Sequence, residues 1–138
     1  MTTKALDTVK TFYATVFQSG DIDASHVMLA DDFVDHAPWP GHPTTREGFR
    51  AGTAEMRAAF PDLTVEPTKM VEEDDKIAVV VRISGTQHGE FMGHAATGRA
   101  FDIEGVDILR VKDGKLCEHW GVMDSGRMLA QLRLAPPV

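Results

Sequence analysis

The spacing of apolar residues divides the chain into a helical first part and an extended second part. Apolar side chains recur at helical spacing over residues 6–17, with polar residues between them. Asp23 is a suitable N-cap for a short second helix, and Thr44 opens a capping-box sequence for a third helix that Pro61 would end. The first part of the chain therefore predicts three helices, with a brief extended segment at residues 32–37 between the second and the third.

From Asp62 onward the apolar residues partly follow the two-residue period of strands, and β-branched residues become frequent. Four strands and then a short helix are expected over residues 63–73, 76–87, 99–113, 115–123 and 124–134. Asp113-Gly114 is the strongest hairpin signal, because a type I′ turn requires positive φ at both central residues. Helices followed by antiparallel strands are typical of the α+β class, in which one curved sheet wraps around the helices and leaves a cavity at its open end.

Alternation along the two hairpin arms separates two faces of different chemistry. One face carries Gly105, Asp107, His119 and Gly121. The other face carries Val106, Ile108, Trp120 and Val122. We expect the apolar second face to form a homodimer interface, so that the first face looks into the cavity. The alternative, which alternation alone leaves open, is that Asp107 and His119 lie in solvent on an ordinary exposed strand.

The hairpin turn also sets an expected register between the two arms. Counting outward from the turn pairs Lys112 with Lys115 and places Asp107 opposite Trp120, diagonal to His119. Diagonal neighbours on adjacent strands are close enough for polar side chains to meet. A hydrogen-bonded pair of Asp107 and His119 is therefore expected.

Composition narrows the class of protein further. The 138 residues, of which 43% are hydrophobic and 25% charged, suit a single globular domain over residues 1–138. A formal net charge of −7, with scattered acidic residues, argues against a nucleic-acid partner and against an anionic membrane surface. The single cysteine, Cys117, excludes an intrachain disulfide. No apolar run approaches the ~20 residues that span a bilayer. From these two features we expect a cytoplasmic protein. The six histidines lack the spacing of a metal-ligand set, so no metal is expected.

Five segments closely resemble the SnoaL-like polyketide (ester) cyclases, in the same order and over nearly the whole chain: "DDFVDHAPWPG", "AFPDL", "GTQHGEFMGHAATGRAF", "DILRVKDGKLCEHWGVMD" and "MLAQL". The resemblance implies the conical α+β barrel of the nuclear-transport-factor-2-like superfamily, in which a strongly curved mixed or antiparallel sheet wraps around N-terminal helices. It also implies a homo-oligomer built on the open sheet face and cofactor-free chemistry inside the cone. The best-known members close a ring by intramolecular aldol condensation in aromatic polyketide biosynthesis.

An aldol closure needs a base beside the carbon α to a carbonyl, donors for the enolate oxygen and an acid for the new alkoxide. The polyketide-cyclising members carry a carboxylate two residues after the hairpin histidine, where this chain has Gly121. They carry a histidine where this chain has Asp107, so we expect Asp107 to supply the carboxylate from the opposite arm. With His119 it would form an acid/base pair, assisted by Asp35 or Asp124.

Further residues are expected to bind the substrate: Tyr13, Phe17, His36, Trp39, Met56, Gln87, His88 and Gly121. Three functions fit this pattern. The first is a cofactor-independent cyclase or isomerase for a hydrophobic, carbonyl-bearing small molecule. The second is a hydratase or epoxide-opening enzyme that uses the same cavity, and the third is a small-molecule-binding module without catalysis. Cys117 near His119 suggests a Cys–His nucleophile, but a buried apolar thiol is the simpler interpretation because nothing orients that pair.

Overall fold

The computed structural model describes residues 3–135, so residues 1–2 and 136–138 of the expected domain lie outside the described part. The expected α+β class is confirmed. Along the chain the elements are α1 (Lys4–Phe12), the π-helix η1 (Tyr13–Gln18), the 3₁₀-helix η2 (Ile22–Ala24), α2 (Ser25–Met28), β1 (Leu29–Asp35), α3 (Arg46–Ala59), β2 (Thr64–Glu73), β3 (Lys76–Thr86), β4 (Ala100–Lys112), β5 (Lys115–Met123) and α4 (Ser125–Leu132).

Helices begin near the expected caps, although the capping residues differ. Asp21, not Asp23, accepts a hydrogen bond from the backbone N–H of Ala24 at the start of η2. Thr45, not Thr44, accepts from the N–H of Gly48 at the start of α3. Thr44 and Thr45 are adjacent, and Asp21 and Asp23 are two positions apart, so in both places two nearby residues could serve as the cap and the backbone direction selects one of them.

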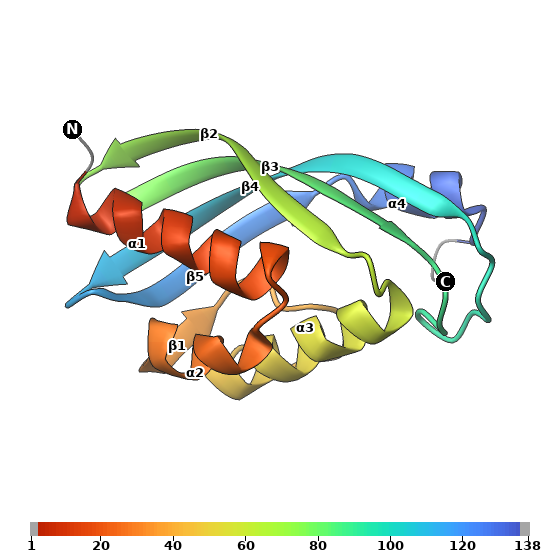
Figure 1. Cartoon of the computed structure of the whole chain (residues 1–138), viewed down its shortest axis with the longest axis horizontal. Coiled ribbons are helices and arrows are strands. Elements are labelled where there is room, and N and C mark those ends of the chain that lie inside the picture. Colours follow the sequence, from red (N-terminus) through yellow and green to blue (C-terminus); the bar gives the residue numbers. More distant parts are fainter. Residues whose placement is uncertain (1–2, 136–138) are drawn as a thin grey trace.

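The strands form one mixed sheet in the order β1-β5-β4-β3-β2. β1 runs parallel to β5, and the other neighbouring strands are antiparallel. Because β1 and β2 are free edges, the curved sheet does not close into a complete barrel. Figure 1 shows the sheet arching over α1 and α3, with β1 and α2 beside α3 and with α4 at the end of the molecule remote from the N-terminus. Curvature of this kind encloses space between the concave sheet face and the helices.

The core fills most of that enclosed space with apolar side chains. Val9 and Val16 of the N-terminal helical segment are fully buried, as are Ile77 and Val79 of β3. Each side chain of this kind stabilises the fold by about 1.5–3 kcal/mol through removal of apolar surface from water. The burial alternates along β3 and β4, so one face of the sheet packs on the helices and the other faces outward.

The hairpin between β4 and β5 has the expected turn. Asp113 and Gly114 have φ of 53° and 75°, which is the left-handed backbone of a type I′ turn. Lys112 pairs with Lys115 beside it, as counted from the sequence. The prediction of this turn from the Asp-Gly pair is therefore confirmed.

The register beyond that turn differs from the expected one. The ladder shifts by one residue at Cys117, which has no partner on β4, and Asp107 consequently lies opposite Gly121 instead of Trp120. The shift is a β-bulge, in which one strand carries an extra residue. It also breaks the alternation of faces, so Leu116 lines the cavity with His119 and Cys117 does not.

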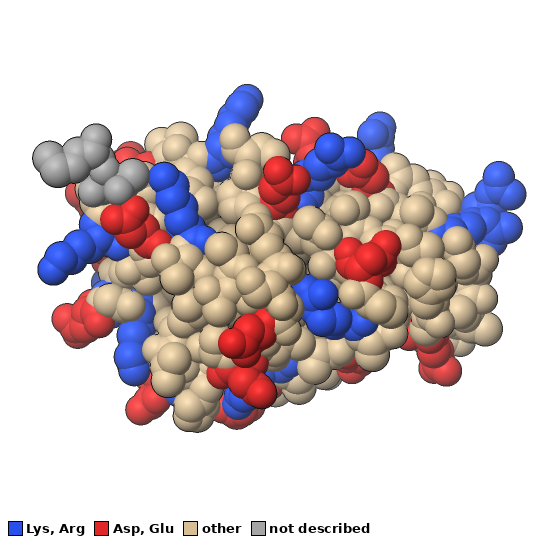
Figure 2. Space-filling model, viewed as in Figure 1, with Lys and Arg blue, Asp and Glu red and all other residues tan. Residues whose placement is uncertain are grey.

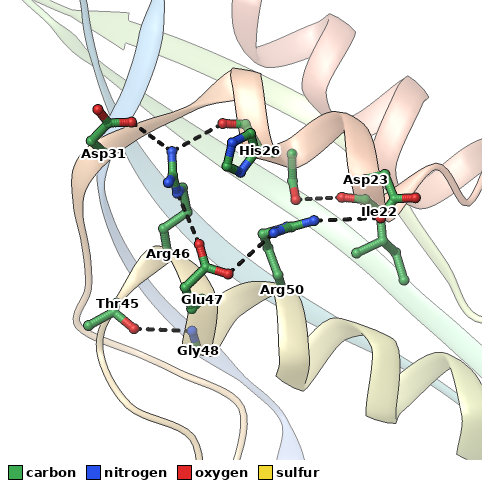
Figure 3. Close-up of polar contacts among 10 residues, drawn as sticks. Ile22, Asp23, His26, Asp31, Thr45, Arg46, Glu47, Gly48 and Arg50 are labelled. Carbon is green, nitrogen blue, oxygen red and sulfur yellow. Dashed lines mark hydrogen bonds and ion pairs between the residues drawn. The ribbon is translucent and has the colours of Figure 1, made fainter.

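Polar contacts fasten the N-terminus of α3 to its neighbours (Figure 3). One guanidinium nitrogen of Arg46 donates to the backbone carbonyl of His26, at 3.2 Å, and to the carboxylate of Asp31, at 2.8 Å. Glu47 accepts from both Arg46 and Arg50. Exposed ion pairs of this kind each contribute less than about 1 kcal/mol. Together they link α3 to α2 and to the edge strand β1.

The outward face of the sheet carries the apolar group expected from alternation. Val106, Ile108 and Val122 are exposed, and the half-buried ring of Trp120 stacks on His36 with ring centroids 5.0 Å apart. The homodimer expected through this face stays a prediction.

Figure 2 shows that on the side of the molecule it displays, Lys and Arg are interspersed with Asp and Glu. Within residues 3–135, no helix is long and apolar enough to cross a membrane.

Candidate functional site

A cavity of about 360 Å³ lies between the concave sheet face and the helices. Its volume falls within the range of small-molecule sites. The aromatic residues in its wall are Phe12, Tyr13, Phe17, Phe33, Trp39 and Phe49. Among the described residues that line the cavity, none is a lysine or an arginine. The chamber therefore suits an apolar, aromatic-sized molecule.

Three polar side chains reach this cavity from three neighbouring strands: Asp35 of β1, His119 of β5 and Asp107 of β4. Asp35 is the direct partner of His119 in the parallel ladder, so their side chains lie on the same face. Asp107 is the partner of Gly121, which puts it diagonal to His119 on that same face. The sheet order thus places the imidazole between two carboxylates.

Both ring nitrogens of His119 contact those carboxylates. Nδ1 lies 2.7 Å from Oδ1 of Asp35, and Nε2 lies 2.9 Å from Oδ1 of Asp107. A neutral imidazole has one N–H and could donate to one of them, whereas an imidazolium donates to both. Burial disfavours the charged ring, but the hydrogen bonds to Asp107 and Asp35 outweigh it and raise the pKa of His119 to about 9. At neutral pH the ring is therefore an imidazolium.

Two further donors hold the carboxylates in place. The hydroxyl of Tyr13 donates to Oδ2 of Asp107 at 2.6 Å, and the backbone N–H of Ala37 donates to Oδ1 of Asp35 at 2.9 Å. Burial, together with the nearby charge of Asp107, raises the pKa of the Tyr13 phenol well above its usual value, so the phenol remains a donor. Tyr13 begins the π-helical segment η1, a conformation that is frequent at functional sites.

The three groups differ in how far they open to the cavity. The side chain of Asp35 is 2% exposed, that of His119 is 16% exposed and that of Asp107 is 21% exposed. Asp35 is therefore shielded behind His119, and both nitrogens of His119 are already engaged. Asp107 is the group best placed to touch a bound molecule, with His119 behind it as a charged donor.

Four of the residues expected to bind substrate line the cavity: Tyr13, Phe17, Trp39 and Gly121. Trp39 is oriented by a hydrogen bond from its indole N–H to the hydroxyl of Thr53, at 3.0 Å. Phe33 and Phe49 also line the cavity, although they are not among the residues expected to bind substrate. Phe33 lies two residues before Asp35 on β1, so the same alternation that places Asp35 could have found it.

Two residues expected in the cavity wall lie elsewhere. His36 follows Asp35 on the chain and therefore points to the opposite side, where its Nε2 lies 2.6 Å from a carboxylate oxygen of Glu118. Met56 is 4% exposed and belongs to the core without lining the cavity. The apolar stripe of α3 is wide enough to serve both the core and the cavity, and Met56 falls on the core side.

Gln87 is likewise a structural residue, because its buried amide braces the loop that follows it. The two N–H bonds of the amide are shared among the backbone carbonyls of Gly89, His94 and Ala95, which lie 3.2–3.3 Å from the nitrogen, and the amide oxygen accepts from Thr97. Neither Gln87 nor the neighbouring His88, which is exposed, lines the cavity. The sequence around Gln87 does not distinguish a glutamine that stabilises a loop from one that binds a substrate.

Asp124, expected to assist catalysis, instead caps a helix. Its carboxylate accepts a hydrogen bond from the backbone N–H of Arg127 at the start of α4, and the side chain is largely exposed. Cys117 also lies outside the cavity lining, and burial raises the pKa of its thiol, which disfavours the reactive thiolate. The Cys–His alternative therefore has no geometric support.

The cluster of Asp35, His119 and Asp107 contains residue types that also bind metal ions. Within residues 3–135, no group of three or more His, Cys, Asp or Glu side chains is arranged to hold a metal ion. In the cavity both nitrogens of His119 already face carboxylate oxygens, so neither lone pair is free for a ligand bond. The arrangement instead suits proton transfer.

The chain matches the family model described as SnoaL-like polyketide cyclase over residues 7–132. No curated protein matches the sequence. Among solved structures, IdmH from Streptomyces antibioticus, described as a candidate polyketide cyclase, is 34% identical over 96% of this chain and 100% of its own, with a TM-score of 0.82. TsrD from Streptomyces laurentii is 27% identical over 94% of each chain, also with a TM-score of 0.82. AclR from Streptomyces galilaeus, described as a candidate hydroxylase, is 26% identical over 96% of this chain and 95% of its own, with a TM-score of 0.77.

Proposed function

Because the chain belongs to the SnoaL-like polyketide cyclase family, we propose that it is a cyclase or isomerase-type enzyme for a hydrophobic, carbonyl-bearing, polyketide-like small molecule. It would use general acid/base catalysis without a cofactor. The observation that carries the proposal is the Asp107 carboxylate, which faces an aromatic cavity while Tyr13 and His119 hold both of its oxygens. A carboxylate fixed beside an apolar binding space is suited to remove a proton from carbon.

The reaction begins with Asp107 as the base. Its carboxylate takes a proton from the carbon α to a carbonyl group, and an enolate and a neutral Asp107 carboxyl result. The enolate carbon then attacks a second carbonyl carbon of the same molecule, which forms the new carbon–carbon bond and leaves an alkoxide. The carboxyl of Asp107 returns its proton to that alkoxide. The sequence consumes and releases no atom, so the product is an isomer of the substrate.

His119 and Asp35 would act through Asp107. The imidazolium donates to the Asp107 carboxylate and keeps it in one orientation, and Asp35 fixes the ring from the other side. When Asp107 becomes neutral during the reaction, its oxygen is a weaker acceptor, and the hydroxyl of Tyr13 is free to turn toward the enolate oxygen. The buried cluster thus supplies a base, an oriented charge and a donor at one place.

A second candidate function uses the same cavity for water addition or epoxide opening. AclR, described as a candidate hydroxylase, supports only the point that a protein of similar structure carries a description other than cyclase. In that reaction Asp107 would activate a water molecule instead of a C–H bond. A binding module without catalysis is the third possibility, and it requires only the aromatic wall of the cavity.

Deuterium exchange separates these functions. We expect the protein to accelerate exchange of the acetyl protons of 2-acetylnaphthalene in D₂O by about a hundredfold or more over buffer, since proton removal α to the carbonyl is the first step. Proton NMR follows the loss of the acetyl signal. If saturation-transfer NMR detects the bound ketone while deuterium exchange of the ketone stays at the buffer rate, the protein is a binding module for this ketone. If a matched aryl epoxide gains the elements of water instead, the second function holds.

A further inference from the structure

Gly121 lies where a side chain would enter the centre of the charged cluster. It is the partner of Asp107 across the β4–β5 ladder and lines the cavity. A Cβ atom built at this position would lie 2.7 Å from Oδ1 of Asp107 and 2.9 Å from Nε2 of His119. Carbon atoms do not approach polar side-chain atoms so closely without displacing them. Residue 121 thus competes for space with the contact between Asp107 and His119.

The neighbours of Gly121 cannot yield without losing a hydrogen bond. Oδ2 of Asp107 accepts from Tyr13, and its Oδ1 faces Nε2 of His119. His119 is held on its other side by Asp35. A shift of either side chain away from a new methyl group would therefore break at least one of these three contacts.

The backbone gives no other reason for glycine at this position. The glycines with positive φ are Gly20, Gly41, Gly93, Gly98 and Gly114, and Gly121 is not among them. Alanine can adopt the extended backbone of residue 121. A glycine inside a strand also lowers the stability of the fold by roughly 0.5–1 kcal/mol relative to alanine. The space that the missing side chain leaves for Asp107 and His119 is the feature that explains the residue.

We propose that Gly121 is a positioning residue, whose missing side chain allows Asp107 on β4 to reach His119 on β5. Positions 107 and 121 then exclude each other: a side chain at 121 displaces the carboxylate that position 107 supplies. The inference rests on the proposed function for its catalytic consequence only, because the contact itself is a matter of geometry.

The test is the Gly121→Ala variant. NMR on histidine-labelled protein measures the pKa of His119 in this variant and in the parent protein. Separation of the carboxylate from the ring is expected to lower the pKa of His119 from about 9 by about 1 unit or more. Gly126→Ala is the matched control, because a Cβ there meets nothing within 4 Å. That variant is expected to leave the pKa of His119 unchanged.

A double variant shows whether the effect passes through Asp107. In an Asp107→Ala background there is no carboxylate to displace, and only the approach of the new Cβ to Nε2 of His119 remains. Adding Gly121→Ala is therefore expected to shift the pKa of His119 less than it does in the parent protein. Equal shifts in both backgrounds, or an unshifted pKa in Gly121→Ala, would overturn the inference.

The titration keeps this inference separate from the proposed function. If the pKa of His119 falls in Gly121→Ala while ketone exchange is absent in every variant, the positioning role stands and the proposed chemistry fails. If Asp107→Asn abolishes exchange while Gly121→Ala retains both the rate and the pKa, the chemistry stands and the positioning role fails.

Discussion

Replacing Asp107 with asparagine is expected to lower the rate of ketone deuterium exchange by about a hundredfold or more, the loss typical of removing a general base. Asparagine keeps the shape of the side chain, but its amide has no useful affinity for a proton. The amide oxygen can still accept from Tyr13, so the cavity wall should be preserved. Initial exchange rates at pH 7 measure the effect, and circular dichroism shows whether the variant remains folded.

Asp124→Asn is the matched control for this substitution. The carboxylate of Asp124 caps α4 away from the cavity, and asparagine is an equally good N-cap. The control is expected to keep both the exchange rate and the stability of the parent protein. Near-parental exchange in Asp107→Asn would remove Asp107 as the base and, with it, the proposed first step.

Replacing His119 with alanine is expected to reduce the free energy of unfolding at pH 7 by about 3–5 kcal/mol, because a partly buried charge cluster loses its cation. Asp35, whose side chain is almost fully buried, would then face Asp107 without a positive charge between them. Urea unfolding measures the change. His26→Ala is the control, since the side chain of His26 is exposed and its removal should change the free energy of unfolding by at most about 0.5 kcal/mol.

The same histidine predicts how stability depends on pH. Its folded pKa of about 9 lies above the ordinary value of 6.5, so folding favours the protonated ring. The resulting stabilisation is complete below about pH 6.5 and is lost as the pH rises through about 9. The parent protein should lose about 3 kcal/mol over that interval, and His119→Ala should not show this loss. A parent stability that does not change between pH 6.5 and 9 would mean that His119 has no raised pKa.

The parts of the site that depend on one hairpin could be predicted from the sequence. The Asp-Gly turn and the alternation of its arms placed Asp107 and His119 on one face, because both signals are local. The resemblance to a family supplied the curved sheet that turns that face inward. The bulge at Cys117 could not be predicted, because a single extra residue leaves no mark on the apolar pattern. As a result of the bulge, the cross-strand partner of Asp107 is Gly121 and not the expected Trp120.

The contacts between distant segments could not be derived in this way. Asp35 and His119 are 84 residues apart, and they meet only because β1 lies parallel to β5 at the sheet edge. Similarly, the sequence shows that position 121 is a glycine without a side chain. That Gly121 lies opposite Asp107 depends on the strand register, which the bulge sets. The bracing role of Gln87 depends on loop carbonyls that no residue pattern specifies. The capping role of Asp124, in contrast, could have been predicted from its place just before the last expected helix.

The central claim is that Asp107 meets the reacting carbon of a carbonyl compound inside the aromatic cavity. A crystal structure of the protein with bound 2-acetylnaphthalene tests it most directly. The methyl carbon of the acetyl group, which loses the proton, is expected at about 3–3.5 Å from a carboxylate oxygen of Asp107, with the naphthalene ring against the aromatic wall. A ketone bound outside this cavity, or bound in it with the acetyl group directed away from Asp107, would contradict the role of Asp107 as the base.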